Sequence, residues 1–558
     1  MLKTDHILAA KNLAALARKS SELYADRTAM SIVLANGMSG HMSFQKLDEL
    51  SDQFAVYLRE VLRLPAGSSV AVQMPNCLPY PIAVFGILKA GLVLVNVNPL
   101  YTVPEMIHQL NDSEAEALIT VDLFQDKAAV MLDKTKVKHL VITRLPEFMP
   151  FLSATIAQTV LKYARKQIPN VDLTHTPFVE ALKLGQSRQS EKGLKTESYF
   201  SSLSRESIAV LQYTGGTTGV SKGAVLTHGN IIANMSQLFP LLSERLESGR
   251  ETVMTALPLY HIFAFTLNFL SFHALGAHNI LIPSPRPISN LRKAFEKFPI
   301  SVLSGVNTLY NALNHETWFQ QNPPKSLRIA VAGGMALHSQ VAASFQKLTG
   351  IPVIEGYGLT ETSPVVSFNP FEKPKDGSIG LPLPDTQVKL IASSGQTAKA
   401  GEPGELAVKG PQVMKGYWKR PEETRMVMQD GWFLTGDIAT QDEEGYLTIV
   451  DRKKDMILVS GFNVYPNEVE EALSQHPQIL EAAVIGVPDG AAGEAVKAIL
   501  VAKGETQPSA EELRAHCKSL LTAYKVPKFF EFRKELPKTP VGKILRKELR
   551  ADQAAQRH

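Results

Sequence analysis

The sequence has little cysteine and no long apolar run. Cys77 and Cys517 are its only cysteines in 558 residues, which excludes a disulfide framework and a thiolate metal site and favours a reducing compartment. The most apolar run, residues 82–97, is interrupted by Lys89 and is too short to span a bilayer. The first twenty residues lack the continuous apolar segment of a secretory signal. We therefore expect a cytoplasmic protein.

Neither basic nor acidic residues are in large excess over the other. The 58 basic and 54 acidic residues give a formal net charge of +4 and are spread along the chain, which argues against nucleic acid as a partner. Peripheral contact with the cytoplasmic face of the inner membrane stays open. Hydrophobic residues make up 44% and charged residues 20%, a composition typical of a globular protein with several domain-sized units.

The first two hundred residues alternate between helix and strand patterns. Ser43 is expected to cap a helix, residues 69–74 to form a buried strand, and the next helix to end near Gly91. Such alternation predicts an α/β protein with mostly parallel strands. The basic, Gln- and Ser-rich residues 182–199 are expected to form an exposed connection.

The pattern changes after about residue 450. Asn467 stands three residues before Glu470, and Ser509 three before Glu512, each just ahead of an apolar-periodic run. We therefore predict a large N-terminal domain of layered α/β subdomains (1–452) and a small, mobile α+β C-terminal domain (453–558).

The stretch QYTGGTTGVSKG (212–223) is rich in glycine and threonine. It is not a nucleotide-hydrolase P-loop, because Lys222 is flanked by Ser221 and Gly223 and because strands are expected at 207–213 and 223–228, with the helix starting only near Asn230. Glycine backbones can approach phosphate oxygens and donate N–H bonds, and Thr214, Thr217 and Thr218 add hydroxyl donors. A phosphate-binding loop is favoured over a mobile surface loop.

Four further stretches support a nucleotide site. EGYGLTE (355–361) ends in a carboxylate suited to Mg²⁺, and DGWFLTGD (430–437) places Asp437 after a tight turn, where it could accept both hydroxyls of a ribose. IVDRKKD (449–455) is a charge run at the domain junction, and PKTPVGKILRKEL (537–549) holds Lys543 in a loop after a glycine. Each alone is better explained as an ordinary turn, helix start or basic face, but their joint order is hard to ascribe to chance.

These motifs resemble those of the adenylate-forming enzymes, which include acyl-CoA synthetases, peptide-synthetase adenylation domains and luciferases. The resemblance covers residues 23–549, and residues 94–102, 213–224, 356–370 and 451–473 are similar to bacterial long-chain fatty acid–CoA ligases. Ser221 stands where many relatives have Ala or Pro. The resemblance implies that ATP activates a fatty acid as acyl-adenylate, with loss of pyrophosphate, and that CoA then displaces AMP. ATP, Mg²⁺ and CoA are the implied cofactor and co-substrates.

The resemblance also implies roles for individual residues. The phosphate loop would comprise Tyr213, Thr214, Gly215, Gly216, Thr217, Thr218, Gly219, Val220, Ser221, Lys222, Gly223 and Ala224. Thr214 and Glu361 would lie near Mg²⁺, and Asp437 and Arg452 would hold the ribose. Residues near the adenine or elsewhere in the nucleotide site would be Gly333, Gly334, Glu355, Gly356, Tyr357, Gly358 and Thr360.

The implied catalytic group is Lys543, which would bridge the fatty carboxylate and the α-phosphate. Because Lys543 would then obstruct CoA, the small domain is expected to rotate about a hinge at Lys454 and to bring Gly461 to the pantetheine channel. His261 would lie at the carboxylate end of the acyl pocket, and Phe265 would stand at a tunnel gate. From the residues alone, the aromatic stretch 257–276 fits a buried helix as well as a ligand tunnel.

Other functions stay open at this point. An acyl-AMP ligase that loads a carrier protein is disfavoured because residues 440–470 contain no extra insertion. A medium-chain or other carboxylate–CoA ligase is a second alternative, and a non-catalytic nucleotide-binding protein a third. Preferred chain length, a homodimeric state and membrane contact are not decided by the sequence.

Overall fold

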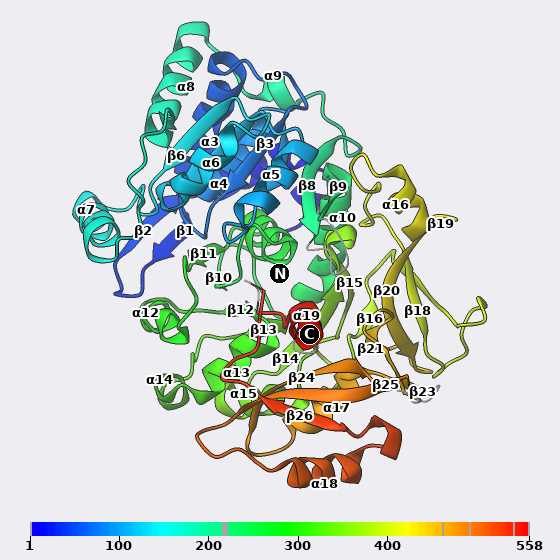
Figure 1. Ribbon diagram of the computed structural model, residues 1–558. Helices are drawn as coiled ribbons and strands as arrows, with labels where there is room; N and C mark the ends of the chain where they lie inside the picture. Colours follow the sequence, from blue (N-terminus) through cyan, green and yellow to red (C-terminus); the bar gives the residue numbers. More distant parts are fainter. Residues whose placement is uncertain (1–2, 215–220, 460–461, 490–492, 540–541, 556–558) are drawn as a thin grey trace.

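The computed structural model describes residues 3–214, 221–459, 462–489, 493–539 and 542–555 (Figure 1). Its first large sheet has seven strands in the order β7-β6-β5-β3-β4-β8-β9, parallel except for the last pair. In that order the strands are Thr176–Pro177, His139–Thr143, Ala117–Val121, Ser69–Gln73, Val93–Asn96, Ile208–Thr214 and Lys222–Thr227. Its associated helices are α3 (Phe44–Val56), α4 (Pro79–Lys89), α5 (Val103–Asp112), α6 (Gln125–Leu132), α7 (Phe151–Thr159), α8 (Phe178–Lys192) and α9 (Glu197–Phe200).

The second large sheet has nine strands in the order β16-β15-β14-β13-β12-β10-β11-β1-β2. In that order the strands are Leu381–Pro382, Val365–Phe368, Val353–Gly358, Ile329–Ala332, Val302–Gly305, Thr252–Thr255, His278–Leu281, Thr28–Val33 and Ser39–Ser43. The pairs from β14 to β1 are parallel, and antiparallel strands close both edges. Helices α11 (Phe272–Ala274), α12 (Arg292–Lys297), α13 (Asn307–His315), α14 (Thr317–Gln321) and α15 (Ser339–Thr349) accompany this sheet. Helix α2 (Leu13–Leu23) packs on α3 and α4, α10 (His228–Leu242) on β8 and β9, and α1 (Asp5–Leu8) on α2 and α10.

A five-stranded sheet follows in the chain, and a two-stranded and a three-stranded sheet come after it. The five-stranded sheet contains β17 (Gln387–Ile391), β18 (Gly404–Lys409), β19 (Met428–Gln429), β20 (Trp432–Gln441) and β21 (Leu447–Arg452), with helix α16 (Pro421–Val427) beside it. The last hundred residues form the hairpin β22 (Ile457–Val459) and β23 (Phe462–Val464), the sheet β24 (Ile479–Pro488), β25 (Glu494–Ala502) and β26 (Phe529–Phe532), and helices α17 (Pro466–Ser474), α18 (Ala510–Leu520) and α19 (Arg546–Ala555). The predicted α/β class with a small α+β C-terminal part is confirmed.

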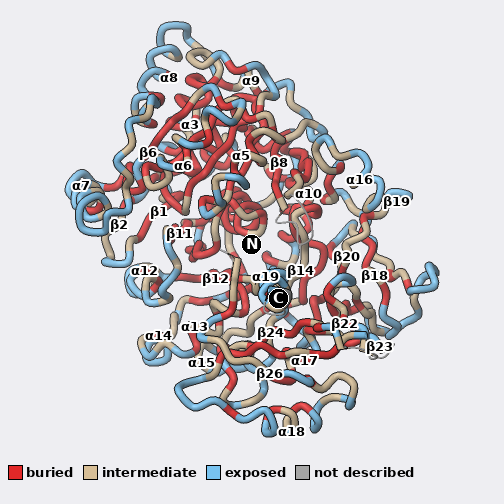
Figure 2. Tube along the Cα trace, viewed as in Figure 1, coloured by how far each residue is buried: buried red, intermediate tan, exposed pale blue. Residues whose placement is uncertain are grey.

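The large part of the chain, which ends near residue 452, and the C-terminal part after it bury separate sets of apolar side chains. Most large-part strands are buried along their length, as the red segments in Figure 2 show. Residues after 456 form their own two apolar clusters, around Ile457, Val484 and Leu513 and around Ile485 and Leu536. Among the described residues, no apolar cluster combines these side chains with those of the large part. The C-terminal part therefore has a core of its own.

Two local predictions were wrong. Residues 182–199 do not form an exposed connection: most of them belong to helix α8, whose Ala181, Leu182 and Gly185 are buried while its polar side chains face solvent. Asn467 does not cap a helix, because α17 begins at Pro466 with Tyr465 at the cap position. The Ser43 and Ser509 caps are confirmed, the latter as a capping box with Glu512. No helix in the described part of the chain is long and apolar enough to cross a membrane.

Candidate active site

Two antiparallel strands flank the glycine-rich stretch. Strands β8 and β9 pair up to Thr214 opposite Lys222, and helix α10 starts only at His228, so the strands expected on both sides of the stretch are confirmed. The predicted loop residues Gly215, Gly216, Thr217, Thr218, Gly219 and Val220 lie outside the described residues. Near the end of the strand pairing that adjoins the glycine-rich stretch, the Tyr213 hydroxyl donates to Asp112 Oδ2 at 2.7 Å. A Cβ at Gly223 would come within 3.1 Å of the Tyr213 ring, so the close approach favours glycine there.

A segment that the sequence analysis missed, residues 414–418, lies along the outer edge of the hairpin formed by β8 and β9. The Trp418 amide donates to the Gly223 carbonyl at 2.7 Å, and the Val225 amide donates to the Gly416 carbonyl at 2.9 Å. The Tyr417 ring lies 5.1 Å from Lys222 Nζ, which is a cation–π distance. Two aromatic residues after a glycine were the only sequence signal, and that pattern is too common to assign a role.

Glu361 is connected to the hairpin through Tyr417. The Tyr417 hydroxyl donates to Glu361 Oε1 at 2.7 Å, and the short helix Thr360–Thr362 that carries Glu361 contacts the ends of β8 and β9. Burial raises the pKa of Glu361 despite this hydrogen bond. A nearby cation would favour the ionised carboxylate, so the residue suits a divalent metal. No group of three His, Cys, Asp or Glu side chains that could hold a metal occurs within the described ranges. A Mg²⁺ ion here would take most of its other ligands from phosphate and water.

The glycines of β14 let backbone strands approach closely. A Cβ at Gly358 would lie 1.9 Å from the Pro364 carbonyl oxygen, and one at Gly333 would lie 3.1 Å from the Gly356 carbonyl oxygen. Strands β13 and β14 are neighbours, with Ala332 paired to Glu355. This pairing places the predicted residues close together in the chain fold: Gly333 and Gly334 directly follow β13, Glu355 and Gly356 lie in β14, and Thr360 begins the short helix after β14. Burial raises the pKa of Glu355 to about 8, and the charge of Glu471 acts in the same direction.

Tyr357, Asp437 and Arg452 form one polar cluster. Asp437 lies opposite Arg452 in the β20–β21 pairing, and Arg452 Nε lies 3.2 Å from Asp437 Oδ1. The Tyr357 hydroxyl donates to Asp437 Oδ2 at 2.6 Å. The tight turn expected before Asp437 is formed by Asp430 and Gly431, and Asp437 lies farther along, within the ten-residue strand β20. The buried carboxylate is thus held rigidly by two side chains from separate strands.

Lys543, from the C-terminal part, lies near enough to this cluster for its charges to act on the ammonium. It lies in the loop before α19, as predicted, and the preceding Gly542 packs against Val306 and Thr308 of the large part. Burial lowers the pKa of Lys543 to about 7, the Arg452 charge adds to this effect, and Asp437 opposes it. Burial, together with the Lys543 charge, lowers the pKa of His261 to about 4. Lys543, His261, Asp437 and Arg452 therefore influence one another electrostatically.

Lys454 lies at the junction of the two parts. Burial and the Arg452 charge lower its pKa to about 8. The predicted CoA-channel residue Gly461 lies outside the described residues.

The aromatic stretch after His261 is a buried helix in this conformation. Residues Ala264–Ser271 form a π-helix whose side chains are all buried. Phe265 and Phe269 have ring centroids 5.9 Å apart, and Phe269 lies 4.8 Å from Phe85. These rings are packed in the core, which agrees with the buried helix, one of the two alternatives that the sequence left open for this stretch.

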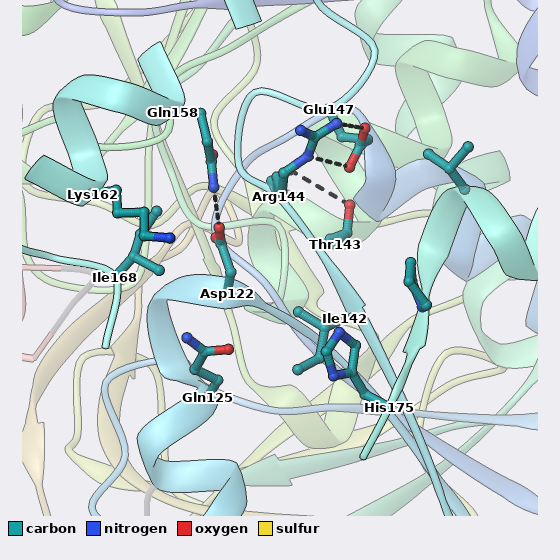
Figure 3. Close-up of a pocket in the computed structure, with 12 residues that line it drawn as sticks. Asp122, Gln125, Ile142, Thr143, Arg144, Glu147, Gln158, Lys162, Ile168 and His175 are labelled. Atoms are coloured by element: carbon teal, nitrogen blue, oxygen red, sulfur yellow. Dashed lines mark hydrogen bonds and ion pairs between the residues drawn. The ribbon is translucent and has the colours of Figure 1, made fainter. Parts of the chain in front are cut away.

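A cavity of about 440 Å³ lies elsewhere, next to β5, β6 and α7 (Figure 3). None of its lining residues belongs to the predicted site.

Two family profiles match the sequence, the AMP-binding enzyme family at residues 17–418 and its C-terminal domain at residues 468–543. The chain belongs to the AMP-binding enzyme family. This enzyme family adenylates substrates with ATP, so the polar cluster and the glycine hairpin lie in an ATP-using protein.

Similar proteins of this family span nearly the whole chain. It is 49% identical over 542 residues to a long-chain-fatty-acid–CoA ligase of Escherichia coli O6:H1, covering 97% of this chain and 94% of that one. It is 38% identical to a long-chain-fatty-acid–CoA ligase of Bacillus subtilis, covering 98% and 96%. Among solved structures, the anthranilate CoA ligase AuaEII in complex with anthranoyl-AMP superposes with a TM-score of 0.85 at 26% identity, covering 98% of each chain. The similarity therefore includes both the large part and the C-terminal part.

Proposed function

We infer that this protein is an AMP-forming long-chain fatty acid–CoA ligase. ATP and the fatty acid give an acyl-adenylate and pyrophosphate: the carboxylate oxygen bonds to the α-phosphorus as the bond to the pyrophosphate oxygen breaks. The CoA sulfur then bonds to the acyl carbon, the proton of the thiol is lost, and AMP leaves. The 49% identity to a ligase of this specificity over 97% of the chain supports the substrate class.

The observation that carries the reaction type is the burial of Lys543, in the loop whose Gly542 packs against Val306 and Thr308, near enough to Asp437 and Arg452 for their charges to shift its pKa. Asp437, oriented by Tyr357 and Arg452, offers a fixed carboxylate to the ribose hydroxyls. The Lys543 ammonium would then lie between the α-phosphate and the fatty carboxylate, where it offsets the negative charge that develops during transfer. Such fixed charge, placed before the reaction begins, is the main means by which enzymes accelerate phosphoryl transfer.

Mg²⁺ is the metal that the oxygen donors fit. Glu361 would supply a carboxylate oxygen and Thr214 a hydroxyl, and the ion would neutralise phosphate charge when bound with ATP. In this proposal, Tyr417 orients Glu361 and lies beside Lys222, which faces the phosphates from the hairpin.

CoA is the proposed thiol substrate, and its entry requires Lys543 to leave. We place the domain boundary after Arg452, with the hinge near Lys454. The separate apolar core of the C-terminal part supports this arrangement, because a rotation would not have to open a shared core. The recorded contacts between the two parts include half-buried polar ones, such as His338 Nδ1 to Glu471 Oε2 at 2.8 Å.

The test is a product assay on purified protein with ATP, Mg²⁺ and fatty acids from short to long, with and without CoA. Mass spectrometry should find acyl-CoA only when CoA is present, with the highest yield for long chains. The Lys543→Ala variant is the control for contaminating activity. Acyl-adenylate that accumulates and ignores CoA would instead indicate a carrier-loading enzyme, and a best yield with short acids would overturn the substrate class.

A further inference from the structure

Helix α7 and the helical turn η3 (Val160–Ala164) that continues it have an exposed apolar face. Sixteen large apolar side chains are exposed in the described part of the chain, and five of them lie in these fourteen residues. They are Phe151, Leu152, Ile156, Val160 and Tyr163, and Phe151 is 82% and Leu152 74% exposed. Figure 2 shows α7 as a pale blue coil at the edge of the molecule. Such a concentration marks an interaction surface, because single exposed apolar side chains are usually scattered.

The opposite face of this helix is packed against the protein. Ala157 is buried, and Ala154 and Leu161 contact the main apolar core. Gln158 Nε2 donates to Asp122 Oδ2 at 2.5 Å across the cavity drawn in Figure 3. The helix is therefore held in place with its apolar face turned outward.

The charged side chains within residues 148–171 have one sign, while Glu147 and Asp172 flank this segment. Residues 148–171 contain Lys162, Arg165 and Lys166 and no Asp or Glu. All three cations are exposed, and within the described part of the chain none of them forms an ion pair. The two acidic side chains that line the cavity behind the helix have other partners: Glu147 forms an ion pair with Arg144 at 2.6 Å, and Asp122 accepts a hydrogen bond from Gln158.

We propose that α7 and η3 dock this protein on the surface of a lipid bilayer that contains anionic lipids. An apolar face next to exposed Lys and Arg is the pattern of a helix that lies in the membrane interface. Phe151, Leu152 and Ile156 would enter the acyl boundary, and Tyr163 would lie at headgroup level, where its ring and hydroxyl are both satisfied. Arg165 and Lys166 would contact lipid phosphates, and Lys162, which lines the cavity behind the helix, would add positive charge close to the surface.

Charge also argues against a second copy of this chain as the occupant. A two-fold symmetric contact through this face would place the two cationic clusters close together, with no described acid on the segment to offset them. A bilayer with anionic headgroups complements both the apolar side chains and the charge.

Vesicle flotation tests the proposal without catalysis, so its outcome is separate from that of the proposed function. Full-length protein is mixed with vesicles of phosphatidylglycerol and phosphatidylethanolamine, or of phosphatidylcholine alone. The wild type should float with the anionic vesicles. The Phe151→Ser, Leu152→Ser, Ile156→Ser triple variant should lower the partition coefficient at least tenfold. Lys162→Gln, Arg165→Gln and Lys166→Gln together should remove the preference for anionic lipid and most of the salt dependence.

Met426→Ser is the matched control, because Met426 is 69% exposed on α16, which lies on the far side of the molecule from α7 in Figure 1. It should float like the wild type. The charge variant keeps the apolar face and gives a second test if the triple serine variant folds poorly in a thermal melt. A wild type that stays unbound, or a triple serine variant that floats normally, would overturn the proposal. So would a wild-type dimer in sedimentation velocity that the triple variant abolishes while vesicle binding persists.

Discussion

The ammonium of Lys543 is buried, which is costly for a charge, and the proposed reaction depends on that charge. A lysine in water has a pKa of about 10.4. Burial and the neighbouring Arg452 lower the pKa of Lys543 to about 7, so at neutral pH the free enzyme holds this side chain about half charged. If the charged form is the one that supports adenylation, activity is lost as the pH rises through this pKa.

The expected size follows from that titration. For a group with a pKa of about 7, the charged fraction is about nine-tenths at pH 6 and about one-tenth at pH 8. The ratio kcat/KM for ATP reports the free enzyme, so it should fall about tenfold between these values. Initial rates of pyrophosphate release at ATP concentrations well below KM measure it. Bound phosphates favour the ammonium, so the same decline in kcat should begin at higher pH.

Two variants assign this decline to Lys543. Glu355 and Lys454, with pKa values of about 8, titrate near the same pH, so the wild-type profile alone is ambiguous. Lys543→Arg keeps the charge at every accessible pH, so its kcat/KM should be lower but without the tenfold decline. Lys538→Arg, in the same loop and ion-paired with Glu481, should keep the decline. A flat wild-type profile, or a decline that persists in Lys543→Arg, would refute the reasoning.

Four further changes test other parts of the site and the fold. Lys543→Ala should slow adenylation about 100- to 1,000-fold yet spare thioester formation from supplied acyl-adenylate; equal losses in single-turnover assays would contradict the two-conformation proposal. Asp437→Asn should lower kcat/KM for ATP about 10- to 100-fold, and an unchanged value would remove Asp437 from the ribose site. Glu361→Gln keeps the shape but removes the charge, so activity should require more Mg²⁺; an unchanged Mg²⁺ titration would exclude a role as ligand. Gly185→Ala would place a Cβ 1.9 Å from the Gln53 carbonyl oxygen and should destabilise the fold by about 1–3 kcal/mol, read as a lower Tm; an unchanged Tm would contradict the close α3–α8 packing.

Local signals predicted the parts of the fold that depend on neighbouring residues. The hairpin at 208–227 follows from two β-branched runs separated by glycines, and the Ser509 cap follows from the Glu three residues later. Lys543 was expected in a loop because Gly542 precedes it. The order of the motifs identified the family, which the comparisons bear out.

Contacts between distant segments could not be read in the same way. Tyr417 joins Glu361 to the glycine hairpin across more than fifty residues, and no local pattern marks that role. Helix α8 was missed because its polar composition hides a narrow buried face. Of the buried residues of α8, Phe178 and Ala181 precede the stretch and only Leu182 and Gly185 lie within it. Glycine has a low helix propensity, so Gly185 argued against a helix although it is needed there for close packing against Gln53.

The failed cap at Asn467 has a structural cause that bears on the domain rotation. The Asn467 amide, at the start of α17, donates to Asp451 Oδ2 at 2.8 Å, so a buried carboxylate from the other side of the junction satisfies this helix end. Glu470, the expected partner of Asn467, instead binds Arg546 at 2.6 Å. Because Asp451 precedes the proposed hinge at Lys454 and Asn467 follows it, a rotation at Lys454 would separate α17 from its acidic partner. Such a step exchanges a buried, charge-assisted hydrogen bond for water, so these contacts favour the arrangement in which Lys543 is engaged. The CoA-competent arrangement must supply compensating contacts of its own.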